Sequence, residues 1–475
     1  MYQKYLRVDP KFKRRLMGTL GGGTFRLCYQ CGVCTAICPA TGFIEVFRPN
    51  KIIELAKLGI RSHAYSKGFW LCAACNTCVK NCPQRVDVAG IMHALKTLAI
   101  KEGEKPKFLT NGFEETLREV PFPVVYSWLC LNPRLDSSKR CEYDDFVLEA
   151  IQKILDRRRE VKALPKTHKE TVAVIGSGPA GLTAAWELVN AGYPVTVFES
   201  LPEPGGMLRV GIPDYRLPKE ILDEEIRYIK GLGIEIRTDS TVNKDRFNEI
   251  REEYDVVFIA TGAHKGRKLN VEGEDLEGVI HALDFMRQVN LEGRARIRGK
   301  VIVIGGGGVA VDAARTALRS GAESVQLVCL ESREEMPAHE WEVREALTEG
   351  VTLHTSWGTK RILGGRRVYG VEFVRCTSVF DEKGRFNPSF DETETKVLEA
   401  DTVILAIGQT PDLSFIEDEI EVDRGVIKVN PITMETSLPG VFAGGDVVSG
   451  SASVVEAIEA GKIAATSIDR YLTGK

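Results

Sequence analysis

Short runs of apolar, largely β-branched residues recur along the C-terminal two thirds of the chain, and they have the length of buried strands. The runs end in glycine-rich turns, small residues or an acid, and two of them lead directly into an apolar helical pattern. Strands that alternate with helices in this way predict an α/β fold with parallel sheets. The runs lie at residues 172–175, 194–198, 254–263, 300–304, 324–330, 401–409 and 440–446.

The first strand runs into a turn that reads Gly-Ser-Gly-Pro-Ala-Gly. In a dinucleotide fold Gly176 allows the tight turn, Gly178 lets the backbone approach a pyrophosphate, and Gly181 lets helix and strand pack closely. Free N–H groups at the start of the helix favour the phosphates. The next strand ends in an acid that would accept a hydrogen bond from a ribose hydroxyl. The predicted site comprises Gly176, Gly178, Pro179, Ala180, Gly181 and Glu199, and the alternative is a purely structural glycine turn.

A second strand, glycine turn and helix lie between two matching strand ends, 254–263 and 401–409. The turn has glycine or alanine at the fingerprint positions and is followed by a helical pattern over 311–319. One dinucleotide unit is therefore expected inside another, and the alternative is a relic turn that binds nothing. The residues proposed for these turns are Gly262, Gly305, Gly307, Gly308, Val309, Ala310 and Gly408.

Eight of the twelve cysteines fall in two runs of the pattern C-x2-C-x2-C-x3-C-P. This spacing is the ferredoxin signature for 4Fe–4S clusters, in which the fourth cysteine of each run binds the other cluster. Zinc is the alternative, although zinc sites usually take their thiolates in pairs. Helical patterns over 49–65 and 88–99 predict a mainly α-helical, ferredoxin-like domain. One cluster is assigned to Cys28, Cys31, Cys34 and Cys82, and the other to Cys72, Cys75, Cys78 and Cys38.

The length of 475 residues suggests about three domains. Lys and Arg number 63 against 66 Asp and Glu, a near balance that argues against a nucleic-acid partner. No signal-peptide pattern and no apolar run of about 18 residues occurs, so we expect a cytoplasmic protein without membrane insertion. The expected domains are 1–105 (ferredoxin-like), 106–169 (connector), 170–290 (first part of the outer dinucleotide unit), 291–402 (inner unit) and 403–475 (second part of the outer unit).

Two resemblances extend this picture. The cysteine domain resembles the C subunit of heterodisulfide reductases, whose two cysteine runs are also spaced by helices. From about residue 170 onward, the chain resembles the glutamate synthase small subunit, the flavin subunit of ferredoxin:NADP transhydrogenases and the N-terminal half of dihydropyrimidine dehydrogenase, through GGML at 205–208 and GIPDYRLP at 211–218. This resemblance implies FAD in the outer unit and a nicotinamide nucleotide in the inner one. It also implies flavin contacts for Gly205, Gly206, Leu208, Gly445, Asp446 and, at the start of a helix over 451–471, Ser453 and Val454.

The acidic position of the inner unit departs from the relatives that use NADPH. Those relatives carry an arginine pair where this chain has Leu330 and Glu331, which are followed by Ser332 and Arg333. A carboxylate there accepts a hydrogen bond from a ribose 2′-hydroxyl and repels a 2′-phosphate. We therefore expect NADH in preference to NADPH, with Arg333 as the residue that would still favour NADP(H).

No pattern indicates a nucleophile or a metal-bound water, which is consistent with hydride chemistry performed by a cofactor. The expected path leads from NADH through FAD and two 4Fe–4S clusters to partner subunits that dock near the ferredoxin-like domain. The leading complexes are heterodisulfide-reductase-like, with flavin-based electron bifurcation as one mode. The alternatives are a glutamate synthase small subunit and a scaffold subunit whose cofactors are structural.

Overall fold

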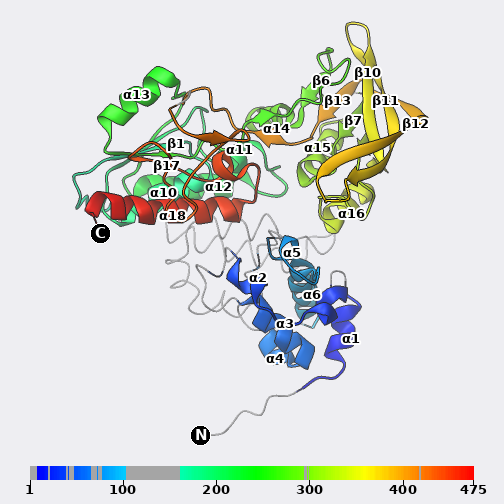
Figure 1. The fold of residues 1–475 in the computed structure, drawn as a ribbon, viewed down its shortest axis with the longest axis horizontal. Coiled ribbons are helices and arrows are strands. Elements are labelled where there is room, and N and C mark those ends of the chain that lie inside the picture. Colours follow the sequence, from blue (N-terminus) through cyan, green and yellow to red (C-terminus); the bar gives the residue numbers. More distant parts are fainter. Residues whose placement is uncertain are drawn as a thin grey trace. The chain divides into compact units, whose positions relative to one another are not determined.

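The computed structural model describes residues 8–19, 22–38, 41, 48–65, 72, 77–102, 161–293, 297, 299–416 and 419–474 (Figure 1). The chain divides into two compact units. The first unit consists of Met1–Leu164, Arg227–Gly233 and Ser453–Lys462, and the second of Pro165–Ile226, Ile234–Ala452 and Ile463–Lys475. Cys75 and most of the expected connector lie outside the described residues.

The described N-terminal part of the first unit is helical. Its helices are α1 (Phe12–Met17), the 3-10 helix η1 (Gly23–Leu27), α2 (Val33–Ala36), α3 (Pro49–Leu58), α4 (Arg61–Ala64), α5 (Thr77–Lys80) and α6 (Val88–Lys101). Pro49 starts α3, and Gly59 ends it in the left-handed conformation with a φ of 73°. The helical pattern over 49–65 is therefore two helices that meet at Gly59. Apolar faces of α1, α3 and α6 supply the core, in which Phe12, Ile53 and Leu95 are fully buried.

A five-stranded parallel sheet forms one part of the second unit, with the strand order β17-β4-β1-β2-β3. Its strands are β1 (Val172–Ile175), β2 (Val195–Phe198), β3 (Glu235–Arg237), β4 (Val256–Ile259) and β17 (Val441–Ala443). Helices α10 (Pro179–Asn190) and α13 (Lys244–Glu253) lie on opposite sides of this sheet (Figure 1). Phe247 and Ile250 of α13 pack with Ala173 and Val257 in one buried cluster. Four further helices lie in the segments that flank these strands in the chain: α11 (Met207–Val210), α12 (Lys219–Gly231), α17 (Asp446–Ser449) and α18 (Val454–Thr473).

A second five-stranded parallel sheet has the order β6-β13-β7-β8-β9. Its strands are β6 (Val279–His281), β7 (Lys300–Ile304), β8 (Ser324–Val328), β9 (Thr352–His354) and β13 (Thr402–Leu405). Alternate residues of a strand point to opposite faces. Val301 and Val303 therefore pack with α14 (Ala282–Glu292), α15 (Gly308–Arg319) and α16 (Glu340–Thr348). Ile302 and Ile304 pack with an antiparallel sheet formed by β10 (Trp357–Gly364), β11 (Val368–Phe380) and β12 (Phe386–Glu399).

The second sheet is inserted between strands of the first, because β6 to β13 follow β4 and precede β17 in the chain. The two connections lie side by side, since β5 (Lys265–Gly266) pairs antiparallel with β14 (Gln409–Thr410). A further hairpin joins β15 (Val422–Asp423) to β16 (Val426–Ile427). Each parallel sheet has the strand, turn and helix order of a dinucleotide fold. The predicted architecture, two nested Rossmann-like domains preceded by a helical domain, is confirmed.

Candidate functional site

The glycines of the first turn meet three different steric demands. Gly176 has a φ of 105°, and a Cβ there would lie 2.4 Å from the carbonyl oxygen of Ala260. A Cβ on Gly181 would lie 2.0 Å from the Gly176 carbonyl oxygen, so close packing of α10 on its own turn requires glycine. Gly178 instead faces open space, with no atom of the described residues within 4 Å of the Cβ position. This space fits a pyrophosphate at the free N–H groups of α10, which begins with Pro179 and Ala180.

The acid after β2 is hydrogen-bonded to this turn. One carboxylate oxygen of Glu199 accepts hydrogen bonds from the backbone N–H of Ser177, at 3.0 Å, and from the Ser177 hydroxyl. The other oxygen accepts from the N–H of Leu201 at 2.8 Å. The Ser177 hydroxyl also accepts from the N–H of Gly205 at 3.0 Å. Glu199 is only 5% exposed, so the network holds a buried carboxylate between the turn and the Gly205 loop.

The loop after β2 closes directly on the glycine turn. Gly206 has a φ of 53°, and a Cβ there would lie 2.7 Å from Cα of Gly178. Gly205 also has a positive φ, 127°, and Leu208 of α11 is fully buried. The GGML segment and the first fingerprint, which are separated by β2 in the chain, are therefore in contact.

The carboxyl ends of β1, β4 and β17 bring further predicted residues to one edge of the first sheet. β4 pairs with β1 on one side and with β17 on the other, so the turns after these strands are neighbours. Gly262 follows β4 with a φ of 69°, and Gly445 follows β17 with a φ of 77°. Asp446 begins α17, and its carboxylate accepts from the N–H of Ala452 at 3.3 Å. The Thr261 hydroxyl is buried and has no hydrogen-bond partner among the residues that the structure describes, and such a donor fits a bound group with acceptor oxygens.

Two residues beside this edge carry little sequence signal. The His264 ring lies 3.5 Å from the Cβ position of Gly262, and Arg287 of α14 approaches Nδ1 of His264 at 3.4 Å. Burial lowers the pKa of His264, the Arg287 charge lowers it further, and the Glu199 charge opposes them. Within the described part of the chain, the buried Nε of Arg287 also has no hydrogen-bond partner. A histidine just after a Thr-Gly-Ala turn is the one signal that the sequence offers.

Ser453 and Val454 stand at the start of α18, in the part of that helix that belongs to the first unit. The Ser453 hydroxyl accepts from the N–H of Glu456 at 3.3 Å, and the Glu456 carboxylate accepts from the N–H of Ser453 at 2.8 Å. These reciprocal bonds form a capping box, which fixes the helix start. A flavin contact for these two residues stays a prediction.

The second glycine turn repeats the geometry of the first. Gly305 has a φ of 142°, and a Cβ there would lie 2.3 Å from the carbonyl oxygen of Ala406, the residue after β13. Gly307 precedes α15 and faces open space, since none of the described residues has an atom within 4 Å of its Cβ position. A Cβ on Gly305 would also lie 3.4 Å from the Cβ of Ala310, so the Ala310 position requires a small residue as well. The other predicted residues are Gly308 and Val309, which begin α15, and Gly408, which follows β13 with a φ of 110°.

Two carboxylates touch the second turn. A Cβ on Gly306 would lie 2.5 Å from Oε2 of Glu331, the acid after β8. A Cβ on Gly308 would lie 3.4 Å from Oε2 of Glu342 in α16. Burial raises the pKa of Glu331. The charged groups against these glycines are therefore acidic, which suits ribose hydroxyls better than a phosphate.

The neighbouring arginine is already engaged. Arg333 forms an ion pair with Glu340 of α16 at 3.0 Å, and its Nη1 lies 3.6 Å from Sδ of Met336. The N–H of Ser332 donates to the Glu335 carboxylate at 3.3 Å. Arg333 would have to leave Glu340 to bind a 2′-phosphate.

An ionic cluster, which we call the Arg216 cluster, joins the GIPDYRLP loop to the helices of the second sheet. Arg216 binds Asp312 of α15 at 2.6 Å and Glu342 of α16 at 3.1 Å. The Tyr215 hydroxyl donates to Asp312 at 3.2 Å. Burial raises the pKa of Asp312, and the Arg216 charge opposes this effect. The cluster links the loop beside the first turn to the helix that starts at the second.

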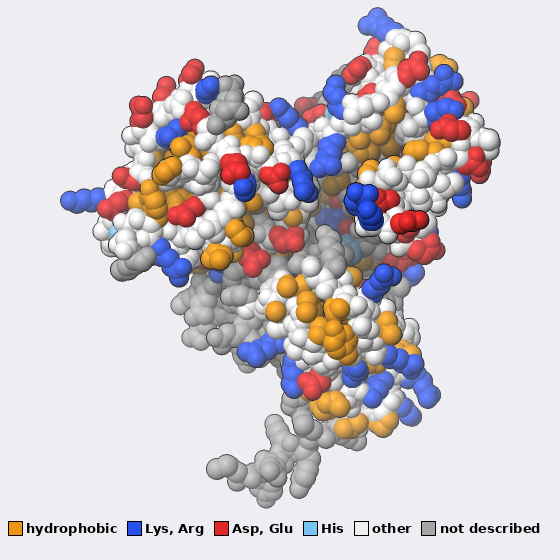
Figure 2. Space-filling model, in the orientation of Figure 1, with side chains coloured by type: hydrophobic (Ala, Val, Ile, Leu, Met, Phe, Trp, Pro, Cys, Tyr) orange, Lys and Arg blue, Asp and Glu red, His pale blue; other side chains and the backbone are white. Residues whose placement is uncertain are grey.

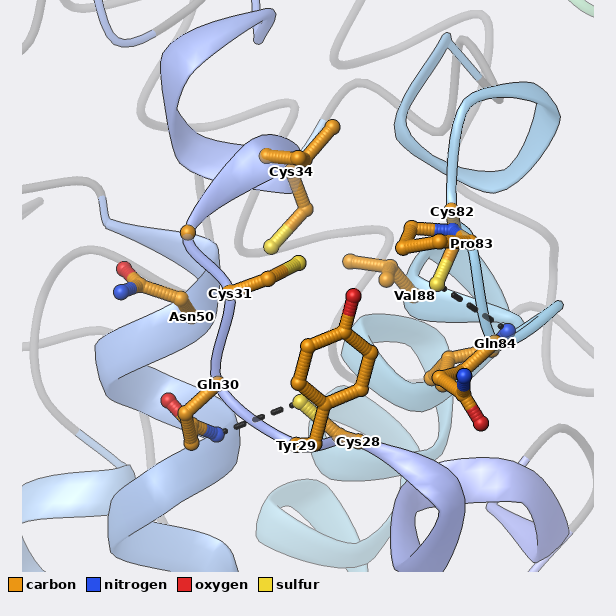
Figure 3. Close-up of a pocket in the computed structure, with 13 residues that line it drawn as sticks. Cys28, Tyr29, Gln30, Cys31, Cys34, Asn50, Cys82, Pro83, Gln84 and Val88 are labelled. Atoms are coloured by element: carbon orange, nitrogen blue, oxygen red, sulfur yellow. Dashed lines mark hydrogen bonds between the residues drawn. The ribbon is translucent and has the colours of Figure 1, made fainter.

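Four cysteines from the two runs line one pocket of the first unit (Figure 3). They are Cys28, Cys31 and Cys34 of the first run and Cys82, the last cysteine of the second run. Figure 3 shows their side chains directed toward the same space. They are the four cysteines that the spacing rule assigns to one cluster, and thiolates spread around a pocket fit a group larger than one ion. Within the described ranges, no group of three or more His, Cys, Asp or Glu is arranged to hold a single metal ion.

The electrostatics of this pocket suit a cationic iron core. The pKa of Cys34 is raised to about 11, mainly by burial and also by the thiolates of Cys28, Cys31 and Cys82. Mutual repulsion of this kind is relieved when iron binds the sulfurs. Nε2 of Gln30 donates to Sγ of Cys28 at 3.2 Å, and the N–H of Val86 donates to Sγ of Cys82 at 3.3 Å. Hydrogen bonds to cluster sulfurs are one of the ways in which a protein tunes the reduction potential.

The described cysteines of the second set are Cys38, Cys72 and Cys78. Cys78 is buried, and Cys38 and Cys72 are half-buried. The fourth member of the set, Cys75, lies outside the described residues. Ligation of a second cluster by these cysteines therefore stays a prediction.

A lysine binds the backbone at the first cysteine of each run. Lys57 of α3 donates to the carbonyl oxygen of Cys28, and Lys96 of α6 donates to that of Cys72 at 2.9 Å. Each lysine comes from a helix that follows its run in the chain. Lys96 is 5% exposed, whereas Lys57 is partly exposed. The pKa of Lys96 is lowered to about 8, because the effect of burial outweighs the opposing charge of the Cys72 thiolate.

Comparison with known proteins agrees with this division of the chain. Residues 170–461 match the pyridine nucleotide-disulphide oxidoreductase family, and residues 27–86 match the 4Fe–4S dicluster domain. The chain is 39% identical over 434 residues to the NADP(+)-dependent formate dehydrogenase subunit beta of Moorella thermoacetica, which covers 83% of this chain and 60% of that subunit. It thus spans less than two thirds of that relative's length. It is 35% identical over 467 residues to the glutamate synthase [NADPH] small chain of Halomonas elongata, which covers 91% of this chain and 94% of the relative.

The fold is shared with Mycobacterium tuberculosis FprA in complex with NADPH, at a TM-score of 0.56 and 20% identity over 65% of this chain and 85% of that chain. Among the helices of the described ranges, none has both the length and the apolar character that a membrane crossing requires. The resemblance inferred from the GGML and GIPDYRLP segments is confirmed. The chain belongs to the pyridine nucleotide-disulphide oxidoreductase family and carries a 4Fe–4S dicluster domain in residues 27–86.

Proposed function

We propose that this chain moves electrons between NADH and a partner subunit through FAD and two 4Fe–4S clusters. The observation that carries the proposal is the meeting of Cys82 with Cys28, Cys31 and Cys34 at one pocket, in a chain that also holds two dinucleotide turns. A flavin, when bound, exchanges a hydride with a nicotinamide and single electrons with one-electron carriers. A chain with both kinds of site connects a two-electron carrier to a one-electron path.

The outer turn is organised before a nucleotide arrives. Glu199 is already held by Ser177 and Leu201, so little side-chain freedom is lost when it accepts from a ribose hydroxyl. Gly178 leaves room for a pyrophosphate at the start of α10. The buried Thr261 hydroxyl, which has no acceptor among the described residues, can donate to the bound group. These residues bind and orient a dinucleotide, and none of them has to transfer a proton.

Charge at the inner turn favours NADH over NADPH. The Glu331 carboxylate lies against Gly306, where a 2′-phosphate would meet a like charge at the cost of several kcal/mol. The nearby cation, Arg333, is paired with Glu340. The Moorella thermoacetica and Halomonas elongata relatives are named for NADP(+) or NADPH. The preference of this chain for NADH over NADPH therefore has to be measured directly.

Anaerobic stopped-flow reduction of the flavin by equal concentrations of NADH and NADPH measures this preference. We expect NADH to be faster in the wild type. Glu331→Gln removes the repulsion, and Glu331→Arg replaces it with attraction. Each change should therefore raise the NADPH rate relative to NADH, the arginine by roughly 100-fold, since each 1.4 kcal/mol is tenfold. A wild type that is faster with NADPH would overturn this part of the proposal.

The proposed partner is a subunit of a heterodisulfide-reductase-like or electron-bifurcating complex that docks near the iron–sulfur domain. Anaerobic protein should contain about eight irons, as two cubane clusters require. NADH should bleach the flavin and then the clusters. Chromophores that stay oxidised with both nucleotides would leave only the scaffold function. Co-purification under anaerobic conditions would identify the subunits that take the electrons.

A second candidate function is that of a glutamate synthase small subunit. The nearly full-length match to the Halomonas elongata small chain favours it. Glutamine-dependent NADPH oxidation after addition of a glutamate synthase large subunit would decide for this candidate. Oxidation that is insensitive to glutamine would decide against it.

A further inference from the structure

Charge is distributed unevenly between the cysteine-bearing part of the chain and the rest. Residues 1–102 carry 16 Lys and Arg against 5 Asp and Glu, whereas residues 103–475 carry 47 against 61. The total of −3 therefore combines a basic domain with an acidic remainder. Lys and Arg also outnumber Asp and Glu on the face of the described iron–sulfur domain that Figure 2 shows. Two clusters with their thiolates would offset only a few of these excess positive charges.

The acidic residues of the described iron–sulfur domain are engaged internally. Asp9 and Glu102 bind Arg15 at 2.7 and 2.9 Å, and Glu102 also binds Arg61 at 3.1 Å. Glu54 pairs with Lys51, and Asp87 accepts from the N–H of Gly90. These contacts tie the carboxylates to partners within the domain. The uncompensated charge that reaches solvent is therefore positive.

Three of the uncompensated cations come from the segments that form the cysteine pocket. Arg26 precedes Cys28 by two residues, Arg85 follows Cys82 by three, and Arg48 comes two residues before Asn50, which lines the pocket. All three arginines are exposed, and none of their side chains has a hydrogen-bond or ion-pair partner among the residues that the structure describes. Arginine without an internal partner is available for bidentate contacts with carboxylates.

Apolar side chains are exposed beside these arginines. Tyr29, which lines the pocket, is 58% exposed, and Leu27 is 54% exposed. Cys31 is also exposed, so the pocket reaches the surface and a cluster in it would lie close to solvent. Exposed aromatic and arginine residues around one centre are typical of protein interfaces. We call Leu27, Tyr29 and the three arginines the cluster rim.

We propose that the cluster rim is the docking surface for a one-electron carrier protein with an acidic face around its redox centre. The proposal rests on the proposed function, because it names the chemistry of the partner that exchanges electrons with the clusters. Opposite charges steer the encounter, and Tyr29 and Leu27 supply the apolar contact at its centre. Each encounter moves one electron from a reduced cluster to one oxidised carrier. Two encounters therefore balance the oxidation of one NADH to NAD+ and a proton.

A matched pair of probes tests this proposal with the holoprotein. A basic c-type cytochrome and the same cytochrome with succinylated lysines have the same redox centre but opposite charge. We expect NADH-dependent reduction of the succinylated form to be at least about tenfold faster at low ionic strength, and the difference to collapse at high salt. Equal rates, or faster reduction of the native form, would overturn the proposal.

Charge-reversal variants locate the surface. Arg26→Glu, Arg48→Glu and Arg85→Glu together should abolish the preference for the succinylated form. A control with the same change in charge on and beside α1, Lys11→Glu with Lys13→Glu and Arg14→Glu, should keep most of it. An equal loss in both variants would show that net charge acts without a docking surface, and it would overturn the proposal.

Two further measurements separate the possible failures. Iron content and the NADH-dependent flavin bleach are recorded for every variant. Absence of the bleach in wild-type protein contradicts the proposed function itself. A normal bleach with no effect of the rim substitutions contradicts only the docking surface. Because the probe comparison needs only wild-type protein, the proposal stays testable if a variant fails to load its clusters.

Discussion

Replacement of Lys96 by methionine should lower the reduction potential of the second 4Fe–4S cluster that we propose. Lys96 is 5% exposed and donates to the carbonyl oxygen of Cys72, a predicted ligand of that cluster. A buried positive charge stabilises an added electron, so its removal makes reduction harder. Lys57, which binds the carbonyl oxygen of Cys28, is partly exposed. The same substitution there should matter less, because water screens its charge.

The contact geometry sets the size of the effect. A lysine that binds the backbone of a ligand lies about 8 Å from the cluster centre, and at an effective dielectric constant of about 20 its charge contributes about 2 kcal/mol. This equals about 90 mV for one electron, at about 2.3 kcal/mol per 100 mV. For Lys57, a dielectric constant nearer to about 80 reduces the contribution to about 0.5 kcal/mol, or about 20 mV.

Redox titration monitored by EPR at pH 7, where the Lys96 ammonium is protonated, measures both midpoints. Lys96→Met should shift one midpoint downward, and Lys96→Arg, which keeps the charge, should leave it near the wild-type value. Lys57→Met serves as the matched control at the other run. A Lys96→Met protein with both midpoints within about 20 mV of wild type would refute the electrostatic reasoning, as would an equal shift of both.

The remaining predictions test the other sites one at a time. Gly307→Ala puts a methyl group into the open space before α15, so KM for NADH should rise roughly 10- to 100-fold with an unchanged melting temperature in calorimetry. Gly305→Ala should instead lower the melting temperature, because of its φ of 142° and a contact of 2.3 Å with a carbonyl oxygen; equal melting temperatures would contradict this assignment of roles. Cys82→Ser should remove about four irons per chain, while NADH still bleaches the flavin. If the EPR signal that is lost is the one that responds to Lys96→Met, Cys82 does not bind the same cluster as Cys28, Cys31 and Cys34. Arg216→Met strips the cation from the Arg216 cluster and should cost roughly 3–5 kcal/mol in urea unfolding, whereas a loss below about 1 kcal/mol would show that the cluster is solvated.

The sequence predicts those elements in which the spacing of glycines or cysteines follows directly from local steric or ligand requirements. Gly176 and Gly305 meet carbonyl oxygens of the neighbouring strand ends, so a strand followed by this glycine pattern is enough to imply the turn. The cysteine spacing likewise implies the meeting of Cys82 with the first run. By contrast, the contact of Gly206 with Gly178 joins segments separated by β2, and the sequence did not predict it. The resemblance to known families implied only a flavin contact for Gly206.

Contacts between residues far apart in the chain leave no recognisable pattern in the sequence, so they could not be predicted. Lys57 and Lys96 bind cysteine carbonyl oxygens from helices whose spacing predicts only an amphipathic face. His264 and Arg287 meet because α14 packs against β5, the short strand that follows His264. The antiparallel sheet was also not anticipated, since β12 is exposed along nearly its whole length and lacks a regular alternation of apolar and polar residues. The helical pattern over 49–65 runs through Gly59 without interruption. A glycine at such a position is a typical C-cap, and it is the sequence signal that could have predicted the end of α3.

The insertion of one parallel sheet within the other has a consequence for biosynthesis. Every strand of the second sheet lies between Val279 and Leu405, so that sheet is complete in the nascent chain before β17 has been translated. The first sheet begins earlier but waits for β17 at its edge, and Asp446 follows that strand. Because domains fold as their residues emerge from the ribosome, the inner domain can fold while the outer one is still open. The outer nucleotide pocket can therefore close only after β17 has been translated, and a nascent chain that stops before β17 contains the complete inner domain but an incomplete outer pocket.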